Sequence, residues 1–171
     1  MESLACIDSR TSAELVFDQG FGDIFSVRIA GTVINEDILG SLEFATKLAG
    51  SKLVVVLGHT NCGAIKGACD HVQLGNLSTL LNKIQPSVYL ERSTRKDRTS
   101  KNARFVERVT DIQVHRSVEA IVERSAVMRG LVEAGELGLI GGHYSLESGE
   151  VRFLEDTYMC GEVKHFYLEL P

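Results

Sequence analysis

An uninterrupted apolar run, Leu53–Leu57, constrains the fold of this chain more than any other stretch. A strand with one exposed face alternates apolar and polar residues, so a run without alternation predicts a strand buried on both faces. Strands of that kind form parallel sheets covered by helices. The run ends at Gly58, and His59 and Cys62 follow just past its carboxyl end. Open α/β sheets bind ligands at that edge, so these two side chains are candidate metal ligands.

Strand and helix patterns alternate along the residues before this run. Residues 3–8 resemble the end of a strand, and residues 24–29 alternate in polarity as a second strand does. Ser12 and Asn35 are expected to cap the helices that follow these strands. The order strand, helix, strand, helix, strand predicts a parallel sheet with right-handed crossovers.

The stretch after Cys62 is expected to be mainly helical. Asn76 is expected to cap a helix that ends at Pro86, and Ser125 to cap a short helix that follows a longer one over residues 103–124. Residues 92–101 are charged and without period, which predicts a solvated loop, with a phosphate-binding patch as the alternative.

The C-terminal part predicts two paired strands. Residues 137–146 and 151–154 flank a short polar turn, as the strands of a hairpin do. The expected fold class is therefore α/β, with a mostly parallel central sheet flanked by helices and a C-terminal hairpin-like pair of strands. A length of 171 residues with 44% hydrophobic content fits one domain over residues 1–171.

Composition limits the binding partners and the cellular compartment that can be expected for this chain. The formal net charge of -5 gives no reason to expect a nucleic acid or an acidic membrane as partner. No apolar run approaches the roughly 18 residues of a spanning helix, and no signal segment opens the chain, so a cytoplasmic location is expected. Four cysteines are too few for a disulfide-stapled scaffold of this size, which favours metal or core roles. Core packing is favoured for Cys69.

Parallel strands would bring Cys6 to the same sheet edge as His59 and Cys62. Two thiolates and one imidazole suit zinc, and three protein ligands leave a fourth position open for water. Asp8 follows closely enough to accept a hydrogen bond from a zinc-bound hydroxide, and Arg10 could hold Asp8 ionised. The same closeness would also let Asp8 occupy the fourth position itself and close the site.

Other chemistries fail on spacing. A phosphatase loop needs five residues between its cysteine and its arginine, whereas Cys6 and Arg10 have three between them. A redox Cys-x-x-Cys motif fails because His59 stands at its first position. The chain has no glycine-rich phosphate loop of the Walker or dinucleotide type.

Three segments together resemble the β-class carbonic anhydrases: Cys6–Arg10, Gly22–Gly31 and Gly58–Ala64. Weaker similarity continues through residues 139–144 and 149–153, so the resemblance covers nearly the whole chain.

The resemblance implies reversible hydration of carbon dioxide to bicarbonate by a zinc-bound hydroxide. It implies one zinc ion per chain on Cys6, His59 and Cys62, with Asp8 and Arg10 as the catalytic pair. It also implies a homodimer or a higher homo-oligomer. Phe25 would lie on the apolar wall of the substrate cleft, although a plain core position is an equal alternative.

Three features of the family are expected to be missing. Many members have a glutamine shortly before the first zinc cysteine that lines the active site, and this sequence has none there. Members usually carry an N-terminal helical arm that wraps the partner subunit, and this sequence has no counterpart of it. Members with an inhibitory bicarbonate pocket have a tryptophan three residues before the first zinc cysteine, where this chain has Ser3.

Two alternative functions would also use a zinc ion at this site. One is a hydrolase of carbon disulfide or carbonyl sulfide that uses the same site. The other is a non-catalytic structural zinc protein in which Asp8 is the fourth ligand.

Overall fold

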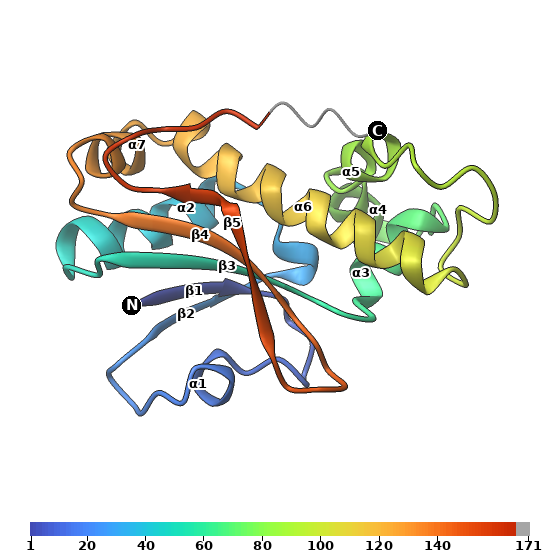
Figure 1. The fold of residues 1–171 in the computed structure, drawn as a ribbon, viewed down its shortest axis with the longest axis horizontal. Coiled ribbons are helices and arrows are strands. Elements are labelled where there is room, and N and C mark those ends of the chain that lie inside the picture. Colours follow the sequence, from blue (N-terminus) through green and yellow to red (C-terminus); the bar gives the residue numbers. More distant parts are fainter. Residues whose placement is uncertain (167–171) are drawn as a thin grey trace.

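The computed structural model describes residues 1–166, and its elements alternate as predicted (Figure 1). The strands are β1 (Glu2–Ala5), β2 (Phe25–Arg28), β3 (Leu53–His59), β4 (Gly138–Tyr144) and β5 (Val151–Met159). The helices are α1 (Ala13–Val16), α2 (Glu36–Glu43), α3 (Gly63–Cys69), α4 (Gly75–Asn82), α5 (Gln85–Leu90), α6 (Ala103–Arg124) and α7 (Ala126–Glu133). Two short turns complete the order, the 3-10 helix η1 (Ala30–Thr32) and the π-helix η2 (Phe44–Leu48).

The five strands form one sheet in the order β2-β1-β3-β4-β5. The first four are parallel, and β5 pairs antiparallel with β4 as the predicted hairpin-like pair. The α/β fold class is therefore confirmed. Strand β3 is central, and six of its seven residues are buried, as the uninterrupted apolar run predicts.

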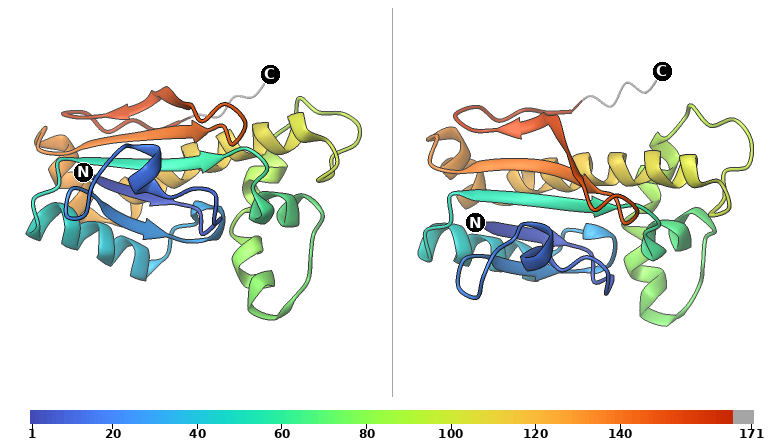
Figure 2. Two further views of the ribbon diagram at one scale, coloured as in Figure 1. Left: turned by 90° about the horizontal axis from the view of Figure 1, so that it is seen from below. Right: turned by 60° about the horizontal axis from the view of Figure 1, so that its bottom comes forward.

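Helices cover the two faces of the sheet unequally. The chain steps from β1 to β2 in one direction and from β2 to β3 in the other, so right-handed crossovers place α1 and α2 on opposite faces. Seen from below, α1 lies in front of the sheet, and α2 and α6 lie behind it (Figure 2). The main core forms on this second face, where Leu4, Val56 and Leu139 pack with residues of α2, α6 and α7. No helix within residues 1–166 is long and apolar enough to cross a membrane.

The predicted helix caps are confirmed in part. Asn35 accepts a hydrogen bond from the Ile38 backbone, and Ser125 caps α7 through the Met128 backbone. Ser12 stands at the N-cap position of α1, but its hydroxyl donates to Glu14 and caps no backbone group. Two further predictions were wrong. Asn76 lies inside α4, whose N-cap position is Leu74. Pro86 belongs to the first turn of α5 and begins that helix, because a proline in the first turn sacrifices no intrahelical hydrogen bond.

We expect the substitution Gly58→Ala to destabilise the fold by about 1–3 kcal/mol, the usual cost of overpacking a core. A β-carbon on Gly58 would lie 2.7 Å from Val114 Cγ2 and 2.9 Å from Thr110 Cγ2, both on helix α6. Gly130→Ala is the matched control, because Gly130 has no neighbour within 4 Å of an added β-carbon and stands in a helix. That change should stabilise by about 0.5–1 kcal/mol. Urea unfolding measures both, and equal effects would contradict this account.

Candidate metal centre

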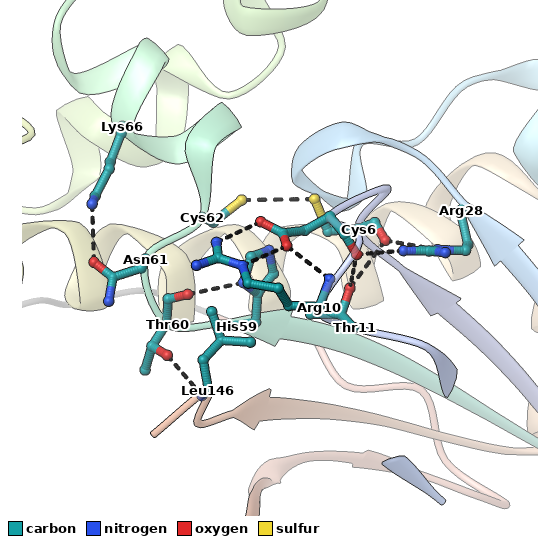
Figure 3. Close-up of polar contacts among 11 residues, drawn as sticks. Cys6, Arg10, Thr11, Arg28, His59, Thr60, Asn61, Cys62, Lys66 and Leu146 are labelled. Carbon is teal, nitrogen blue, oxygen red and sulfur yellow. Dashed lines mark hydrogen bonds and ion pairs between the residues drawn. The ribbon is translucent and has the colours of Figure 1, made fainter. Parts of the chain in front are cut away.

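The three predicted ligands converge at the carboxyl edge of the sheet (Figure 3). Cys6 directly follows β1, and His59 is the last residue of β3, which pairs in parallel with β1. Between His59 and Cys62 the chain turns through Asn61, which has a left-handed backbone with φ of 57° that asparagine tolerates. The turn places Cys62 at the N-cap position of α3. One ligand atom from each of the three residues lies within 4.8 Å of the other two.

The spacing of the two sulfur atoms matches metal ligation. Cys6 Sγ and Cys62 Sγ are 3.8 Å apart, far beyond the roughly 2.05 Å of a disulfide bond. Two thiolates bound at about 2.3 Å to a tetrahedral zinc would themselves be about 3.8 Å apart. Both cysteines are almost fully buried. The pair is therefore separated as two ligands of one ion would be.

The histidine is oriented as a metal ligand. Its Nδ1 lies 2.9 Å from the backbone oxygen of Thr60, an acceptor, so Nδ1 carries the proton and donates it. That tautomer leaves a lone pair on Nε2. In the described part of the chain, His59 Nε2 is buried and has no hydrogen-bond partner. A bound cation would satisfy this atom, and the carbonyl that fixes the ring is a typical outer contact of a ligating histidine.

The two thiols titrate as a pair. The hydrogen bond from Cys62 lowers the pKa of Cys6 well below its usual range, and a hydrogen bond from the Gly31 backbone lowers it further. The same contact with Cys6, together with burial, raises the pKa of Cys62 above its usual range. One thiolate therefore forms easily without a metal, whereas the second needs a cation to stabilise it. Such a pair releases a proton when it binds a metal.

Asp8 and Arg10 form the ion pair that their spacing suggests. Arg10 Nε donates to Asp8 Oδ1 at 2.8 Å, and Arg10 Nη2 donates to Asp8 Oδ2 at 2.7 Å. These bonds hold the pKa of Asp8 well below its usual range. Asp8 does not belong to the cluster of potential ligand atoms that Cys6, His59 and Cys62 form. Both carboxylate oxygens of Asp8 are thus engaged by the guanidinium.

Arg28 holds the loop that carries these residues, and sequence reasoning missed it. Its Nε donates to the Cys6 carbonyl at 3.0 Å, and its Nη2 donates to the Asp8 carbonyl at 2.5 Å. Thr11 Oγ1 donates to the same two carbonyls. The signal was present, because Arg28 is the one charged residue in the strand over residues 24–29. One side chain of β2 therefore fixes the backbone on both sides of Ile7 (Figure 3).

Phe25 lies apart from this centre. It is the first residue of β2 and pairs with Glu2, at the amino edge of the sheet, whereas Cys6 follows the carboxyl end of β1. Its side chain is 40% exposed and lines a separate cavity beside α2. The three ligands and the Asp8–Arg10 pair are brought together within one chain, and Phe25 is not. Its place on a substrate cleft stays a prediction.

A second polar network was not anticipated from the sequence. His143 Nδ1 lies 2.6 Å from Asp111 Oδ1, and Arg152 Nη2 donates to Asp111 Oδ2 at 2.8 Å. The network lines a cavity of about 670 Å³, which shares Thr60 with the loop of the ligands. It ties α6 to β4 and β5. Cys69 is buried and lies outside the group of potential ligands formed by Cys6, His59 and Cys62, which agrees with its predicted core role.

Known proteins are similar to this chain in both sequence and fold. Residues 2–151 match the family described as carbonic anhydrase. Carbonic anhydrase 2 of Mycobacterium tuberculosis is 38% identical over 162 residues, which cover 92% of this chain and 75% of that protein. The solved β-carbonic anhydrase CafA of Aspergillus fumigatus has a TM-score of 0.77 and 25% identity, with 91% of this chain and 78% of that chain covered. The chain belongs to the β-class carbonic anhydrase family.

The fold recurs in a second solved carbonic anhydrase. The β-carbonic anhydrase of Sordaria macrospora, described as tetrameric, has a TM-score of 0.76 and 21% identity, with 90% of this chain and 79% of that chain covered. Reversible hydration of carbon dioxide to bicarbonate is the reaction of the family and the activity of this carbonic anhydrase. The Cys-His-Cys metal site expected of it is present.

We expect Arg28→Ala to lower the hydration rate about 10- to 100-fold, the usual cost of losing an outer contact of a metal site. The variant removes the hydrogen bonds that Arg28 donates to the carbonyls of Cys6 and Asp8. The loop that carries the Asp8–Arg10 pair is then held less firmly. Stopped-flow hydration assays with metal analysis of the same sample test this. Arg129→Ala is the control, since Arg129 donates to the Val122 carbonyl far along the chain from the centre. An Arg28→Ala enzyme as fast as the control would refute the role.

Proposed function

We propose that Cys6, His59 and Cys62 bind one zinc ion and that Asp8 and Arg10 act together beside it in the hydration of carbon dioxide. The observation that carries this proposal is the unpartnered, buried Nε2 of His59 next to two sulfur atoms 3.8 Å apart. Two thiols and one imidazole are the moderately soft donors that zinc prefers, and three protein ligands are the usual number in a catalytic zinc site. Zinc, when bound, supplies the chemistry by making a water molecule acidic enough to attack carbon dioxide near neutral pH.

The chain's own contribution begins with the position of Asp8. Its Oδ1 accepts two hydrogen bonds from Arg10, one from the backbone nitrogen and one from Nε, while Oδ2 accepts one from Nη2. A carboxylate oxygen has two lone-pair sites, so Oδ2 keeps one free. We assign this site as the acceptor of a hydrogen bond from the water that is consumed.

Arg10 keeps that acceptor ionised. The Asp8 side chain is 16% exposed and would lose part of its hydration without a partner. The hydrogen bonds from the Arg10 guanidinium compensate for this loss and lower the pKa of Asp8, so the carboxylate is charged near neutral pH. Arg10 itself is 55% exposed, so it acts by orienting Asp8 and not by closing the site.

Assembly into a homodimer or a larger homo-oligomer is part of the proposal. Two observations support it. Strand β2 is an edge strand of the sheet, with three of its four residues exposed. The related enzyme of Sordaria macrospora is described as tetrameric.

Asp8→Asn tests the proposed function. The amide has the size of the carboxylate but lacks its charge, so we expect turnover to fall at least about 100-fold, as for loss of a general base. Zinc content should remain near one ion per chain, because Asp8 is not among the three proposed ligands. Stopped-flow hydration and metal analysis of one preparation measure both quantities.

Glu155→Gln is the matched control for that variant, because Glu155 is an exposed carboxylate on β5. It should retain both activity and metal. Full activity in Asp8→Asn would remove Asp8 from the mechanism. Loss of zinc together with activity would instead assign Asp8 to the metal shell.

A further inference from the structure

A cavity of about 670 Å³ lies between the amino-terminal turns of α6 and the turn that joins β4 to β5. Its volume is within the range of small-molecule sites, about 300–1,000 Å³. It borders β5, which is the edge strand at the opposite end of the sheet from β2, the edge proposed for assembly (Figure 2). None of the three proposed metal ligands lines it, and neither Asp8 nor Arg10 does so. The cavity is therefore separate from the site that hydrates carbon dioxide.

Positive charge is concentrated beside this cavity. Seven of the 18 lysine and arginine residues of the chain fall within residues 92–108, where Asp97 and Glu107 are the only acidic residues. The chain as a whole has a formal net charge of -5, so this segment differs strongly from the rest. Its helical part supplies Arg104 and Arg108 to the cavity. The field of such a segment attracts an anion toward the cavity.

The three arginines that line the cavity differ in how their charge is paired. Arg152 contacts Asp111 at 2.8 Å, and Arg108 lies 3.7 Å from the buried carboxylate of Glu91. Arg104 pairs with no carboxylate in residues 1–166, and it lies one helical turn before Arg108 on the same face of α6. The guanidinium fork matches the oxygens of a phosphate group. Arg104 and Arg108 together can therefore hold one.

The buried histidine of the cavity has a nitrogen without a partner. His143 is 7% exposed, and its Nδ1 lies 2.6 Å from Asp111 Oδ1, an acceptor, so Nδ1 carries the proton. Its Nε2 is then an acceptor, and this atom is buried without a hydrogen-bond partner in the described residues. Buried polar atoms are normally paired. An unpaired one on a side chain that lines a cavity points to a bound molecule that donates to it.

The rest of the lining is polar. Glu150, Ser148 and Ser145 line the cavity from the β4–β5 turn, and Val151 is the one apolar residue among the described residues that line it. Carboxylates and hydroxyls bind the hydroxyl groups of a ligand, whereas an apolar ligand would find almost no surface to pack against. Together with the arginines, this lining fits a molecule that has both an anionic group and several hydroxyl groups.

We propose that this cavity binds a phosphorylated sugar, with the phosphate group on Arg104 and Arg108 and the sugar hydroxyls on Glu150 and His143. The phosphate accepts hydrogen bonds from the guanidinium groups, and the hydroxyls donate to the carboxylate and to the unpaired Nε2. Inorganic phosphate lacks the second set of contacts, and a free sugar lacks the first. The site is independent of the proposed metal chemistry.

Glucose-6-phosphate, glucose and inorganic phosphate are the probes that test this, because the first combines the two parts that the others carry singly. Isothermal titration of the metal-loaded enzyme at about pH 7.5, where a phosphate monoester is almost doubly charged, should show one saturable site for glucose-6-phosphate. Glucose and inorganic phosphate should each bind at least about tenfold more weakly. Absence of saturable binding would overturn the proposal, and so would equal binding of inorganic phosphate.

Arg104→Gln assigns the phosphate end of the site. The variant should weaken glucose-6-phosphate binding at least about tenfold and leave the hydration of carbon dioxide unchanged. Arg95→Gln is the matched control, because Arg95 is exposed, belongs to the same basic segment and does not line the cavity. It removes the same charge and should change binding less than about twofold, since solvent screens exposed charges. Equal losses in both variants would reduce the effect to general attraction by the segment and refute the site.

Glu150→Gln assigns the sugar end. The change of charge acts on glucose-6-phosphate and on inorganic phosphate alike, so the ratio of their affinities isolates the contact with the sugar. We expect this ratio to fall about threefold to tenfold through loss of a charge-assisted hydrogen bond. Glu147→Gln, an exposed position of the same turn that does not line the cavity, should leave the ratio unchanged. An unchanged ratio in Glu150→Gln would contradict the assignment of Glu150.

A second copy of the chain is the competing occupant of this cavity. Sedimentation velocity with and without glucose-6-phosphate separates the two cases. Under the proposal, the sugar phosphate binds one per chain without changing the oligomeric state. If it binds by dissociating an oligomer, the cavity belongs to an interface between copies and the proposal is wrong.

Discussion

Cys62→Ala should abolish metal binding and, with it, hydration of carbon dioxide. The variant removes one of three donors and leaves Cys6 and His59 as two ligands, which hold zinc far more weakly than a full set. We expect metal content to fall from near one ion per chain to less than about one tenth. Activity should fall in proportion to the metal lost. Metal analysis after gel filtration, with a stopped-flow assay on the same fractions, measures both.

Cys69→Ala is the matched control, because Cys69 is also a buried cysteine of α3. It packs in the same apolar cluster as Cys6 and Cys62 but is not one of the three proposed ligands. We expect it to retain metal and to lose about 1 kcal/mol of stability through the cavity it leaves. Normal zinc content in Cys62→Ala would refute the ligand assignment, and zinc loss in Cys69→Ala would require a different set of sulfur ligands.

The metal centre was predictable because two regular patterns determine it. The apolar run of β3 predicts a buried strand, and the alternation around it predicts that β1 runs parallel. Parallel neighbours end at the same edge, so Cys6 and His59 had to emerge together once their strands were identified. A short turn then confines Cys62 to the same place. Local periodicity was enough here because Cys6 directly follows a strand, His59 ends one and Cys62 stands at the start of a helix.

Contacts between distant segments were not predictable in the same way. Arg28 binds two backbone carbonyls of the loop after β1, and no side-chain pattern encodes a backbone acceptor. The pairing of Asp111 with His143 depends on which turn of α6 faces β4, a matter of packing. Proline suits both the residue after one helix and the first turn of the next, so Pro86 alone does not decide where a helix begins. The sequence specifies such features through tertiary structure, which periodicity does not reveal.

Glu2 should make the protein less stable as pH rises from 5 to 8. Burial raises the pKa of this carboxyl to about 8 in the folded state, partly offset by the amino-terminal ammonium group, from an ordinary value of 4.5. At low pH the Glu2 carboxyl is protonated in both the folded and the unfolded chain, so it does not reduce the free energy of unfolding. Between these two pKa values the unfolded chain ionises while the folded chain keeps its proton, so the free energy of unfolding falls. Above about pH 8 both states are ionised and the loss levels off.

The comparison with Glu2→Gln isolates this effect. The amide cannot titrate, and all other titratable groups contribute equally to the pH dependence of both proteins. Each unit of pKa difference is worth about 1.4 kcal/mol, so the native protein should lose about 2–5 kcal/mol more than the variant between pH 5 and 8. Urea unfolding at several pH values measures the difference. Glu147→Gln, at an exposed position of the β4–β5 turn, should follow the native curve. Parallel curves for the native protein and Glu2→Gln would show that the Glu2 carboxyl already has a partner or reaches solvent.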